Sequence, residues 1–222
     1  MNRTFRSCMA SIACSVVLTS PAALAHTVGV AALSDRFSQD YARDMDSAIE
    51  GIAVPEGSPQ YSRALGIVGK LSAALGQPRW RVIVFQKAKM PRGLDVPAFA
   101  LPDRQIAVSD WDVSVWSDDT LAFVLAHEMG HVELGHQSQV WQTIMERTGL
   151  HPGTWAELSK YAGAAKSLLR AQEYEADRFG FALAQQGGFD AAQGARALFR
   201  NLGRDDMHPS PLSREAALGI WP

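Results

Sequence analysis

Three of the chain's six histidines fall within the twelve residues LAHEMGHVELGH, at positions 125–136. In this stretch His127, Glu128 and His131 form the pattern H-E-x-x-H. On a helix, the first and fifth positions of that pattern point within about 40° of each other, one turn apart. Two imidazoles on one face can bind a zinc ion, and Glu128 stands close enough to act as general base toward the water that the metal activates. The pattern therefore predicts a hydrolytic zinc site.

The residues around the motif indicate whether this helix is buried. The alternative to a metal site is a solvated helix face on which histidine and glutamate occur by chance, and such a face needs polar neighbours. The neighbouring positions are apolar instead: Leu121, Val124, Leu125, Met129 and Val132. We therefore expect a buried helix whose ionisable groups are directed at a metal ion.

A catalytic zinc ion needs a third protein ligand and an open fourth position. One class of sites takes a later histidine in the pattern H-E-x-x-H-x-x-G-x-x-H. That spacing requires the glycine one residue before Gly135 and the last histidine one residue after His136. This chain is therefore excluded from that class. A second class takes a glutamate from a later helix, and a buried helical stripe that contains one carboxylate would supply it.

Residues 154–186 predict one long amphipathic helix on which Glu173 interrupts an apolar stripe. An ionised carboxylate there costs several kcal/mol unless a cation pairs with it, and a zinc ion held by the first helix supplies that charge. We therefore predict Glu173 as the third ligand. Asp177, one turn further on, is expected to accept the free ring N–H of a ligating histidine and so fix its tautomer. The alternative is a pair of carboxylates bound to Arg170 or Arg178.

The order of three motifs also resembles a known family. HEMGH, followed by EYEAD and then HPSPLSR, is similar to the zinc metallopeptidases that include HtpX, BepA and the type I CAAX prenyl proteases, which are gluzincins. The similarity covers about residues 80–216. It implies a metallopeptidase with one zinc ion per chain and with Glu173, the first glutamate of EYEAD, as a ligand. Glu175 lies on another face of the helix, and no role is predicted for it.

The stretch VPAFALPDR resembles the family pattern V-N-A-F-A-L-P-G-G, with two departures. Pro97 replaces the asparagine, and Asp103-Arg104 replace the two glycines. These changes affect how the strand beside the cleft receives a substrate, not the metal chemistry. We expect an extended protein or peptide substrate to pair with the backbone of Ala98, Phe99 and Ala100.

Three further residues carry open interpretations. His208 and Arg214 stand at the H-P and arginine positions of the family's C-terminal motif. One hypothesis is that either side chain reaches the zinc site, where it stabilises the oxyanion or fills the fourth coordination position. The other is that both belong only to the tail around a short helix. His136 could add a hydrogen bond near the site, but the favoured interpretation is a helix-end histidine that faces the last carbonyl groups of its helix.

Hydrophobic periodicity and turn residues predict a mostly helical α+β, zincin-like domain with a small antiparallel sheet beside the H-E-x-x-H helix. Strands are expected at 80–85 and in two extended pieces within 96–109, joined by a Pro-Asp turn. Trp111 and Trp116 are expected to flank a loop. Helices are expected at 34–50, 58–76, 118–136, 138–148, 154–186 and 191–202, with one short helix in the tail.

Residues 1–25 have the pattern of a secretory signal peptide. Arg3 and Arg6 precede an apolar run, and Ala23 and Ala25 form the small-residue cleavage pair. We expect cleavage after Ala25, export to the periplasm, and a single metallopeptidase domain over residues 26–222. The alternative is a lipid anchor on Cys14 that holds the protein at the envelope.

Cleavage of this leader would remove both cysteines and reduce the 21 basic residues to 19 against 23 acidic ones, a net charge of −4. The domain must then fold by core burial alone, which at this length removes about 70% of the unfolded surface from water. The negative charge argues against a nucleic-acid partner. Beyond the leader, no apolar run approaches the length of a membrane span, and the oligomeric state stays open.

The function expected from these features is a zinc endopeptidase of the bacterial cell envelope that acts on misfolded or exported proteins. One alternative is a zinc-stabilised chaperone or adaptor, although a binding module has no use for Glu128. Another is a latent protease in which His208 fills the fourth coordination position.

Overall fold

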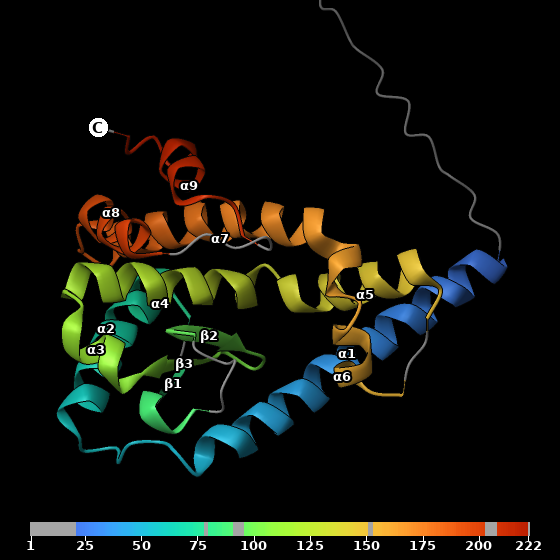
Figure 1. The fold of residues 1–222 in the computed structure, drawn as a ribbon, viewed down its shortest axis with the longest axis horizontal. Coiled ribbons are helices and arrows are strands. Elements are labelled where there is room, and N and C mark those ends of the chain that lie inside the picture. The colour runs from blue at the N-terminus through green and yellow to red at the C-terminus, as the bar shows by residue number, and fades with distance from the viewer. Residues whose placement is uncertain (1–20, 78–79, 91–95, 151–152, 203–207, 222) are drawn as a thin grey trace, which may run out of the picture.

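The computed structural model describes residues 21–77, 80–90, 96–150, 153–202 and 208–221. The helices and strands of these residues, in chain order, are α1 (Pro21–Glu50), α2 (Pro59–Leu75), β1 (Arg81–Phe85), η1 (Lys87–Lys89), β2 (Ala98–Leu101), β3 (Gln105–Ser109), α3 (Asp110–Val115), α4 (Asp118–Glu133), α5 (His136–Thr148), α6 (Trp155–Ser159), η2 (Ala162–Ala165), α7 (Lys166–Gln186), α8 (Ala191–Asn201) and α9 (Pro211–Ala217) (Figure 1). The fold is mostly helical with one small sheet, as predicted. No helix in this described part of the chain is long and apolar enough to cross a membrane.

The predicted leader lies mostly outside the described residues, which begin at Pro21. Helix α1 continues from there through the expected cleavage point after Ala25 without interruption. Cleavage at that point would therefore cut within the first turns of α1 and leave its later turns attached to the domain.

The sheet has three strands in the order β1-β3-β2. Strands β2 and β3 pair antiparallel, as predicted, around a turn in which Asp103 and Arg104 have φ angles of 60° and 57°. Both residues thus hold the left-handed conformation that favours glycine. The prediction of an antiparallel sheet is wrong for β1, which pairs parallel with β3. Strand β3 occupies the centre of the sheet, so β1 pairs with β3 and not with β2. The chain reverses direction once between β1 and β2 and again between β2 and β3, and β1 and β3 therefore run parallel.

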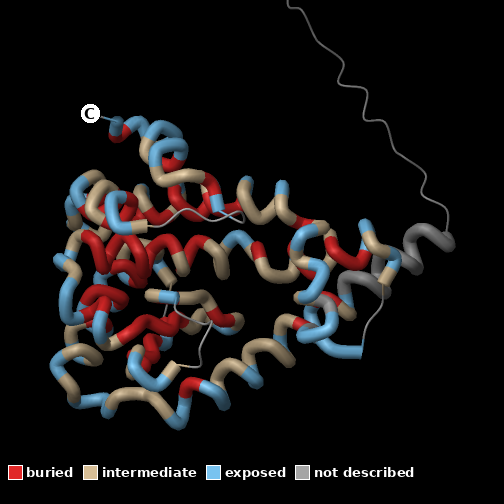
Figure 2. Tube along the Cα trace, viewed as in Figure 1, coloured by how far each residue is buried: buried red, intermediate tan, exposed pale blue. Residues whose placement is uncertain are grey.

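Helices cover both faces of the sheet. Val82, Val84, Ile106 and Val108 pack into the main core with residues of α2 and α4. The opposite face, which includes Phe85, packs against α1. Helix α4 lies in the middle of the molecule, and Figure 2 shows most of its length buried. Its burial explains why the H-E-x-x-H stretch is apolar around its ionisable residues.

Capping residues mark most helix ends, but several predicted boundaries are wrong. The helix expected from residue 34 already includes Pro21, the first described residue. The loop expected between Trp111 and Trp116 is helix α3, which begins because the Ser109 hydroxyl accepts a hydrogen bond from the Asp112 backbone N–H. The helix expected to reach residue 136 ends at Glu133, and Gly135 then turns the chain with a φ of 67°. Further capping residues mark helix ends: Ser58 and Gly76 on α2, Ser117 at the start of α4, Gly149 on α5 and Asp190 on α8.

The single helix expected over 154–186 is divided into α6, η2 and α7. Helix α6 contacts α1 and α5 rather than extending the axis of α7. Ala165, at the end of η2, is buried among apolar residues of α5. The break therefore lets this segment bury apolar surface against α1 and α5, which a straight helix could not do.

Candidate metal centre

Helices α4 and α7 lie side by side because small residues allow their backbones to approach closely (Figure 1). A Cβ atom added to Gly180 of α7 would lie 2.7 Å from the backbone nitrogen of His127 on α4. A Cβ atom added to Gly130 would lie 3.3 Å from the Cα atom of Ala176. This close contact sets the position of Glu173 on α7 relative to the histidines of α4.

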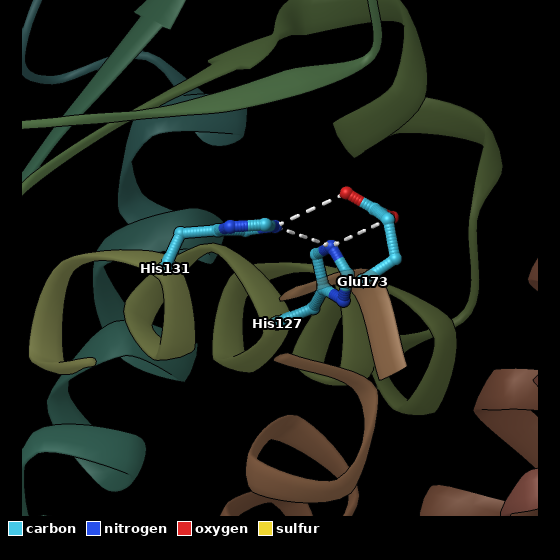
Figure 3. Close-up of side chains that lie close together, drawn as sticks. All are labelled: His127, His131 and Glu173. Carbon is cyan, nitrogen blue, oxygen red and sulfur yellow. Dashed lines mark hydrogen bonds and ion pairs between the residues drawn. The ribbon is translucent and has the colours of Figure 1, made fainter. Parts of the chain in front are cut away.

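The structure brings His127, His131 and Glu173 together (Figure 3). The Nε2 atoms of the two histidines are 3.0 Å apart. The Glu173 carboxylate oxygens lie 3.7 Å from His127 Nε2 and 3.5 Å from His131 Nε2. One donor atom from each residue lies within 4.8 Å of the others. These are the three residues that the sequence singles out as metal ligands. They come from two helices, and Glu173 follows His131 by 42 residues in the chain.

This arrangement fits a zinc ion. Two imidazoles and one carboxylate are a donor set typical of catalytic zinc sites. The Nδ1 atom of each histidine already has a side-chain partner, so both Nε2 atoms remain directed at the space beside Glu173. Burial alone would raise the pKa of Glu173, but the hydrogen bond from His131 and the positive charges of His127 and Arg214 hold it well below its usual range. Glu173 is therefore ionised and able to bind a cation.

Asp177 lies behind His127, where the sequence predicts a partner for its free ring N–H. Its Oδ1 atom is 3.0 Å from His127 Nδ1, and the residue is 1% exposed. Burial alone would lower the pKa of His127, but the hydrogen bond to Asp177 and the two nearby carboxylates raise it overall. A carboxylate on Nδ1 fixes the ring so that Nε2 faces the metal position.

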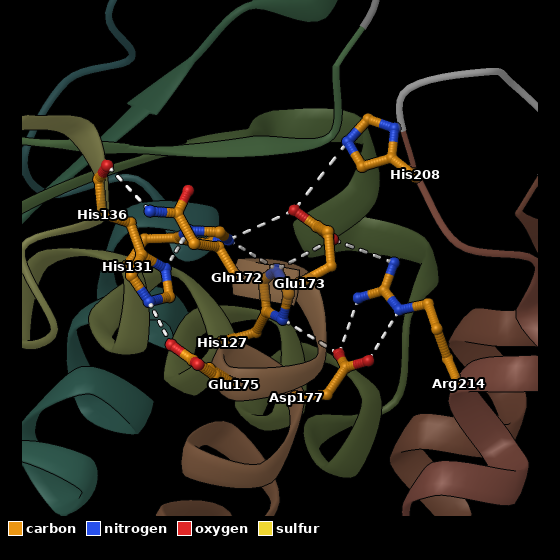
Figure 4. Close-up of polar contacts among 9 residues, drawn as sticks. All are labelled: His127, His131, His136, Gln172, Glu173, Glu175, Asp177, His208 and Arg214. Atoms are coloured by element: carbon orange, nitrogen blue, oxygen red, sulfur yellow. Dashed lines mark hydrogen bonds and ion pairs between the residues drawn. The ribbon is translucent and has the colours of Figure 1, made fainter. Parts of the chain in front are cut away.

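The cation that pairs with these carboxylates is Arg214 of α9, whereas the alternative to a zinc site paired them with Arg170 or Arg178. Arg214 donates to both Asp177 oxygens, at 2.7 and 2.6 Å, and its Nη1 atom lies 3.3 Å from Glu173 (Figure 4). Burial would raise the pKa of Asp177, but the bonds from Arg214 and His127 lower it. Arg214 thus contacts two carboxylates of the site and is itself 5% exposed.

His208 lies on the opposite side of Glu173 from His131, near the tip of the carboxylate (Figure 4). Its Nε2 atom is 3.9 Å from Glu173 Oε1, and its side chain is 53% exposed. Both His208 and Arg214 are therefore brought to the site, His208 from its open side and Arg214 from within the protein.

His136 is not the helix-end histidine that the sequence suggested, because it is 2% exposed and begins α5 instead of ending α4. Its Nδ1 atom is 2.9 Å from His131 Nδ1, and its Nε2 atom is 3.3 Å from Glu175. Glu175 lies on another face of α7 from Glu173, as expected, and from there it contacts His136. The signal that could have revealed this contact is Gly135, a possible turn that redirects the residue after it towards His131.

A cleft of about 1040 Å³ opens over the three side chains. Its wall includes Glu128, His208 and strand β2. Among the described residues, β2 is an edge strand that pairs with β3 on one side. Helix α1 contributes Tyr41, whose phenol has its pKa raised to about 12 by burial and by the charge of Glu128. Glu128, the expected general base, and the expected substrate strand thus line the same cleft as His127, His131 and Glu173.

Comparison with known proteins agrees with this geometry. A family model described as Peptidase family M48 matches residues 65–221. This range includes the three candidate ligands, Glu128, Asp177 and Arg214, and leaves out α1. No curated protein matches the chain. Because the matched range covers more than two thirds of the sequence, the chain belongs to Peptidase family M48, the HtpX/Ste24-type zinc metallopeptidases, and is a zinc-dependent enzyme.

Proposed function

We propose that this metallopeptidase is an endopeptidase of the cell envelope that cleaves extended segments of misfolded or exported proteins. The observation that carries the proposal is the convergence of His127 Nε2, His131 Nε2 and the Glu173 carboxylate in a cleft that also holds Glu128 and one edge of β2. A metal site with an adjacent general base and an adjacent strand is suited to cutting a peptide bond within a chain.

The roles follow from the positions of the side chains. His127, His131 and Glu173 hold the zinc ion, whose chemistry there is to polarise a carbonyl group and to lower the pKa of water toward 7. Glu128, in the cleft wall, removes a proton from the attacking water and delivers it to the nitrogen of the leaving amine. Asp177 accepts a hydrogen bond from the His127 Nδ1–H group, and Arg214 keeps the Asp177 carboxylate ionised.

Strand β2 indicates how the substrate binds. Ala98, Phe99 and Ala100 lie at the edge of the sheet and line the cleft. An extended peptide can add to such an edge through backbone hydrogen bonds, which are independent of the side chains that it carries. This mode favours unfolded segments of varied sequence over one folded target, and it supports misfolded proteins as substrates.

The expected location is the periplasm, because the first 25 residues have the composition of a cleavable export signal. A lipid anchor on Cys14 would place the same domain at the envelope surface. Recovery of the mature chain from a periplasmic extract with His26 at its N-terminus supports export and cleavage, and recovery with a lipid on Cys14 supports the anchor.

A latent form of this enzyme is favoured by His208. Its Nε2 atom lies 3.9 Å from Glu173 Oε1 on the side of the cleft, close enough for a small movement to bring it to the metal position. A histidine in the fourth coordination position would exclude the substrate and the water.

The replacement Glu128→Gln tests the enzymatic role. We expect the variant to bind one zinc ion per chain, as the unaltered protein does, and to lose cleavage of casein by at least about a hundredfold, the usual contribution of a general base. Glu146→Gln removes an exposed carboxylate of α5 and serves as the matched control. Casein that is bound but not cut by the unaltered protein would favour the chaperone alternative. Cleavage retained by the Glu128 variant would remove Glu128 as the base.

A further inference from the structure

The second histidine ligand, His131, is held in a different way from the first. His127 meets a buried carboxylate directly, whereas His131 Nδ1 meets another imidazole, His136 Nδ1, at 2.9 Å. The two rings are close to perpendicular, at 78°, with centroids 4.9 Å apart. A contact between two ring nitrogens at this distance is a hydrogen bond only if one nitrogen carries a proton and the other offers a lone pair.

The metal decides which nitrogen carries that proton. When His131 Nε2 binds a cation through its lone pair, the ring proton of His131 must lie on Nδ1. His136 Nδ1 must then be the acceptor, so its own proton lies on Nε2. The His136 Nε2 atom is buried with no hydrogen bond inside the described protein, and the Glu175 carboxylate lies 3.3 Å from it. A neutral His136 with its proton on Nε2 accepts from His131 and places an N–H beside the Glu175 carboxylate.

The backbone holds His136 in this position. Gly135, with a φ of 67°, turns the chain between α4 and α5 so that His136 faces back toward His131. The Gln172 amide donates to the His136 backbone carbonyl at 3.1 Å and to the Gln139 side chain at 3.0 Å. Gln172 and Glu175 both belong to α7, the helix that supplies Glu173. One helix therefore provides a ligand for the metal and the anchors for the partner of another ligand (Figure 4).

We propose that His136 and Glu175 are positioning residues that hold His131 in the tautomer and orientation needed for zinc binding. This inference rests on the proposed zinc site at His127, His131 and Glu173. Glu175 polarises the Nε2–H bond of His136, His136 accepts the Nδ1 proton of His131, and His131 Nε2 stays directed at the metal. Both residues act through His131 and not on the reacting atoms.

Replacement of His136 tests the proposal through zinc affinity, measured by competition with a chelator, and not through activity. His136→Leu fills a similar volume but leaves the His131 N–H without an acceptor, and we expect zinc to bind about 10- to 100-fold more weakly. His136→Asn places an amide oxygen near the former Nδ1 position, and we expect it to recover most of the lost affinity. A purely structural histidine would give the two variants the same affinity.

Replacement of Glu175 tests the outer end of the chain of contacts without altering the buried ring. Glu175 is half exposed, so water can substitute for part of its role in Glu175→Ala, and we expect a smaller loss of affinity than in His136→Leu. Glu175→Gln keeps an acceptor oxygen and should lie between the alanine variant and the unaltered protein. Glu146→Ala, which removes an exposed carboxylate of α5, is the control and should bind zinc normally.

Substitution of Co²⁺ for zinc supplies an independent readout, because the visible absorption bands of cobalt report the geometry of its ligands. We expect the bands of the His136→Leu protein to shift or weaken and those of His136→Asn to stay close to the original. Zinc affinity unchanged in both His136→Leu and Glu175→Ala would overturn the positioning role while leaving the zinc site intact. Failure of the unaltered protein to bind zinc would overturn the proposed site itself.

Discussion

Asp177 and Arg214 face each other behind His127 and share two hydrogen bonds of 2.7 and 2.6 Å, although 37 residues separate them in the chain. Both are almost fully buried, at 1% and 5% exposed. Arg214 also lies 3.3 Å from Glu173, so one guanidinium faces two carboxylates of the site. This relationship connects the C-terminal helix α9 to the metal centre and explains why a tail residue is part of it.

The loss of Arg214 should destabilise the zinc-free protein. In Arg214→Met, two buried carboxylates lose their cation, and breaking a buried ion pair in this way costs about 3–5 kcal/mol. Arg214→Lys keeps the charge but not the bidentate geometry, so its unfolding free energy should lie between those of Arg214→Met and the unaltered protein. Urea unfolding in the presence of a chelator measures the difference. Arg43→Met, which removes an exposed pair with Asp40, should change the unfolding free energy by less than about 1 kcal/mol. Equal effects of the two methionine variants would contradict the structural role of Arg214.

The approach of α7 to α4 should not tolerate a side chain at position 180. In Gly180→Ala the new methyl would lie 2.7 Å from the His127 backbone nitrogen, so the helices must separate and carry Glu173 away from the histidines. We expect weaker zinc binding and a loss of about 1–3 kcal/mol in unfolding free energy. The control is Gly69→Ala on α2, where the added methyl meets no atom within 4 Å and should stabilise the helix by up to about 1 kcal/mol. Zinc affinity is measured by isothermal titration calorimetry and stability by urea unfolding. Normal affinity and normal stability in Gly180→Ala would mean that the methyl group is tolerated.

Tyr41 should make the stability of the fold sensitive to alkali. Burial and the charge of Glu128 raise the pKa of its phenol to about 12, above the ordinary value of 10. The folded state therefore disfavours the ionised phenol, so stability is unaffected below pH 10 and is lost as the pH rises from 10 through 12. The loss should amount to up to about 3 kcal/mol, at about 1.4 kcal/mol for each pKa unit. The difference in unfolding free energy between the unaltered protein and Tyr41→Phe, followed from pH 8 to pH 11, isolates this effect, and a difference that does not vary with pH would refute it.

The latent form predicts a gain of activity when His208 is removed. If the imidazole fills the fourth coordination position for most of the time, His208→Ala should raise the rate of casein cleavage by the reciprocal of the open fraction, roughly tenfold for a site that is open one tenth of the time. His208→Gln, which keeps a polar side chain that ligates zinc poorly, should show most of the same gain. Rates equal to that of the unaltered protein in both variants would rule out latency by this residue.

The three candidate zinc ligands were predictable because their signal is local. His127 and His131 lie one helical turn apart, and Glu173 interrupts an apolar stripe, so spacing and polarity alone pointed to all three. The strand hairpin and the positions of most helices were predictable for the same reason, since turn and cap residues act within a few positions. Local signals of this kind require no knowledge of how distant segments meet.

The errors concern contacts between distant segments. The parallel pairing of β1 with β3 depends on which strand occupies the centre of the sheet. The break before α7 depends on the contacts that α6 makes with α1 and α5. His136 looked like an ordinary helix end because its partner Glu175 lies 39 residues further along the chain. A sequence lists side chains, but their pairing across space is set by the competition of whole surfaces for burial.

The sequence by itself determined the class of chemistry, because H-E-x-x-H and the buried glutamate restrict the donors, the general base and the metal that they suit. Only the tertiary structure decided how that chemistry is held in place. It brought Arg214 to Asp177, His136 to His131 and β2 to the edge of the cleft. The physical reason is that ligand identity is encoded one residue at a time, whereas the orientation of a ligand depends on hydrogen bonds from segments that meet only after the chain has packed.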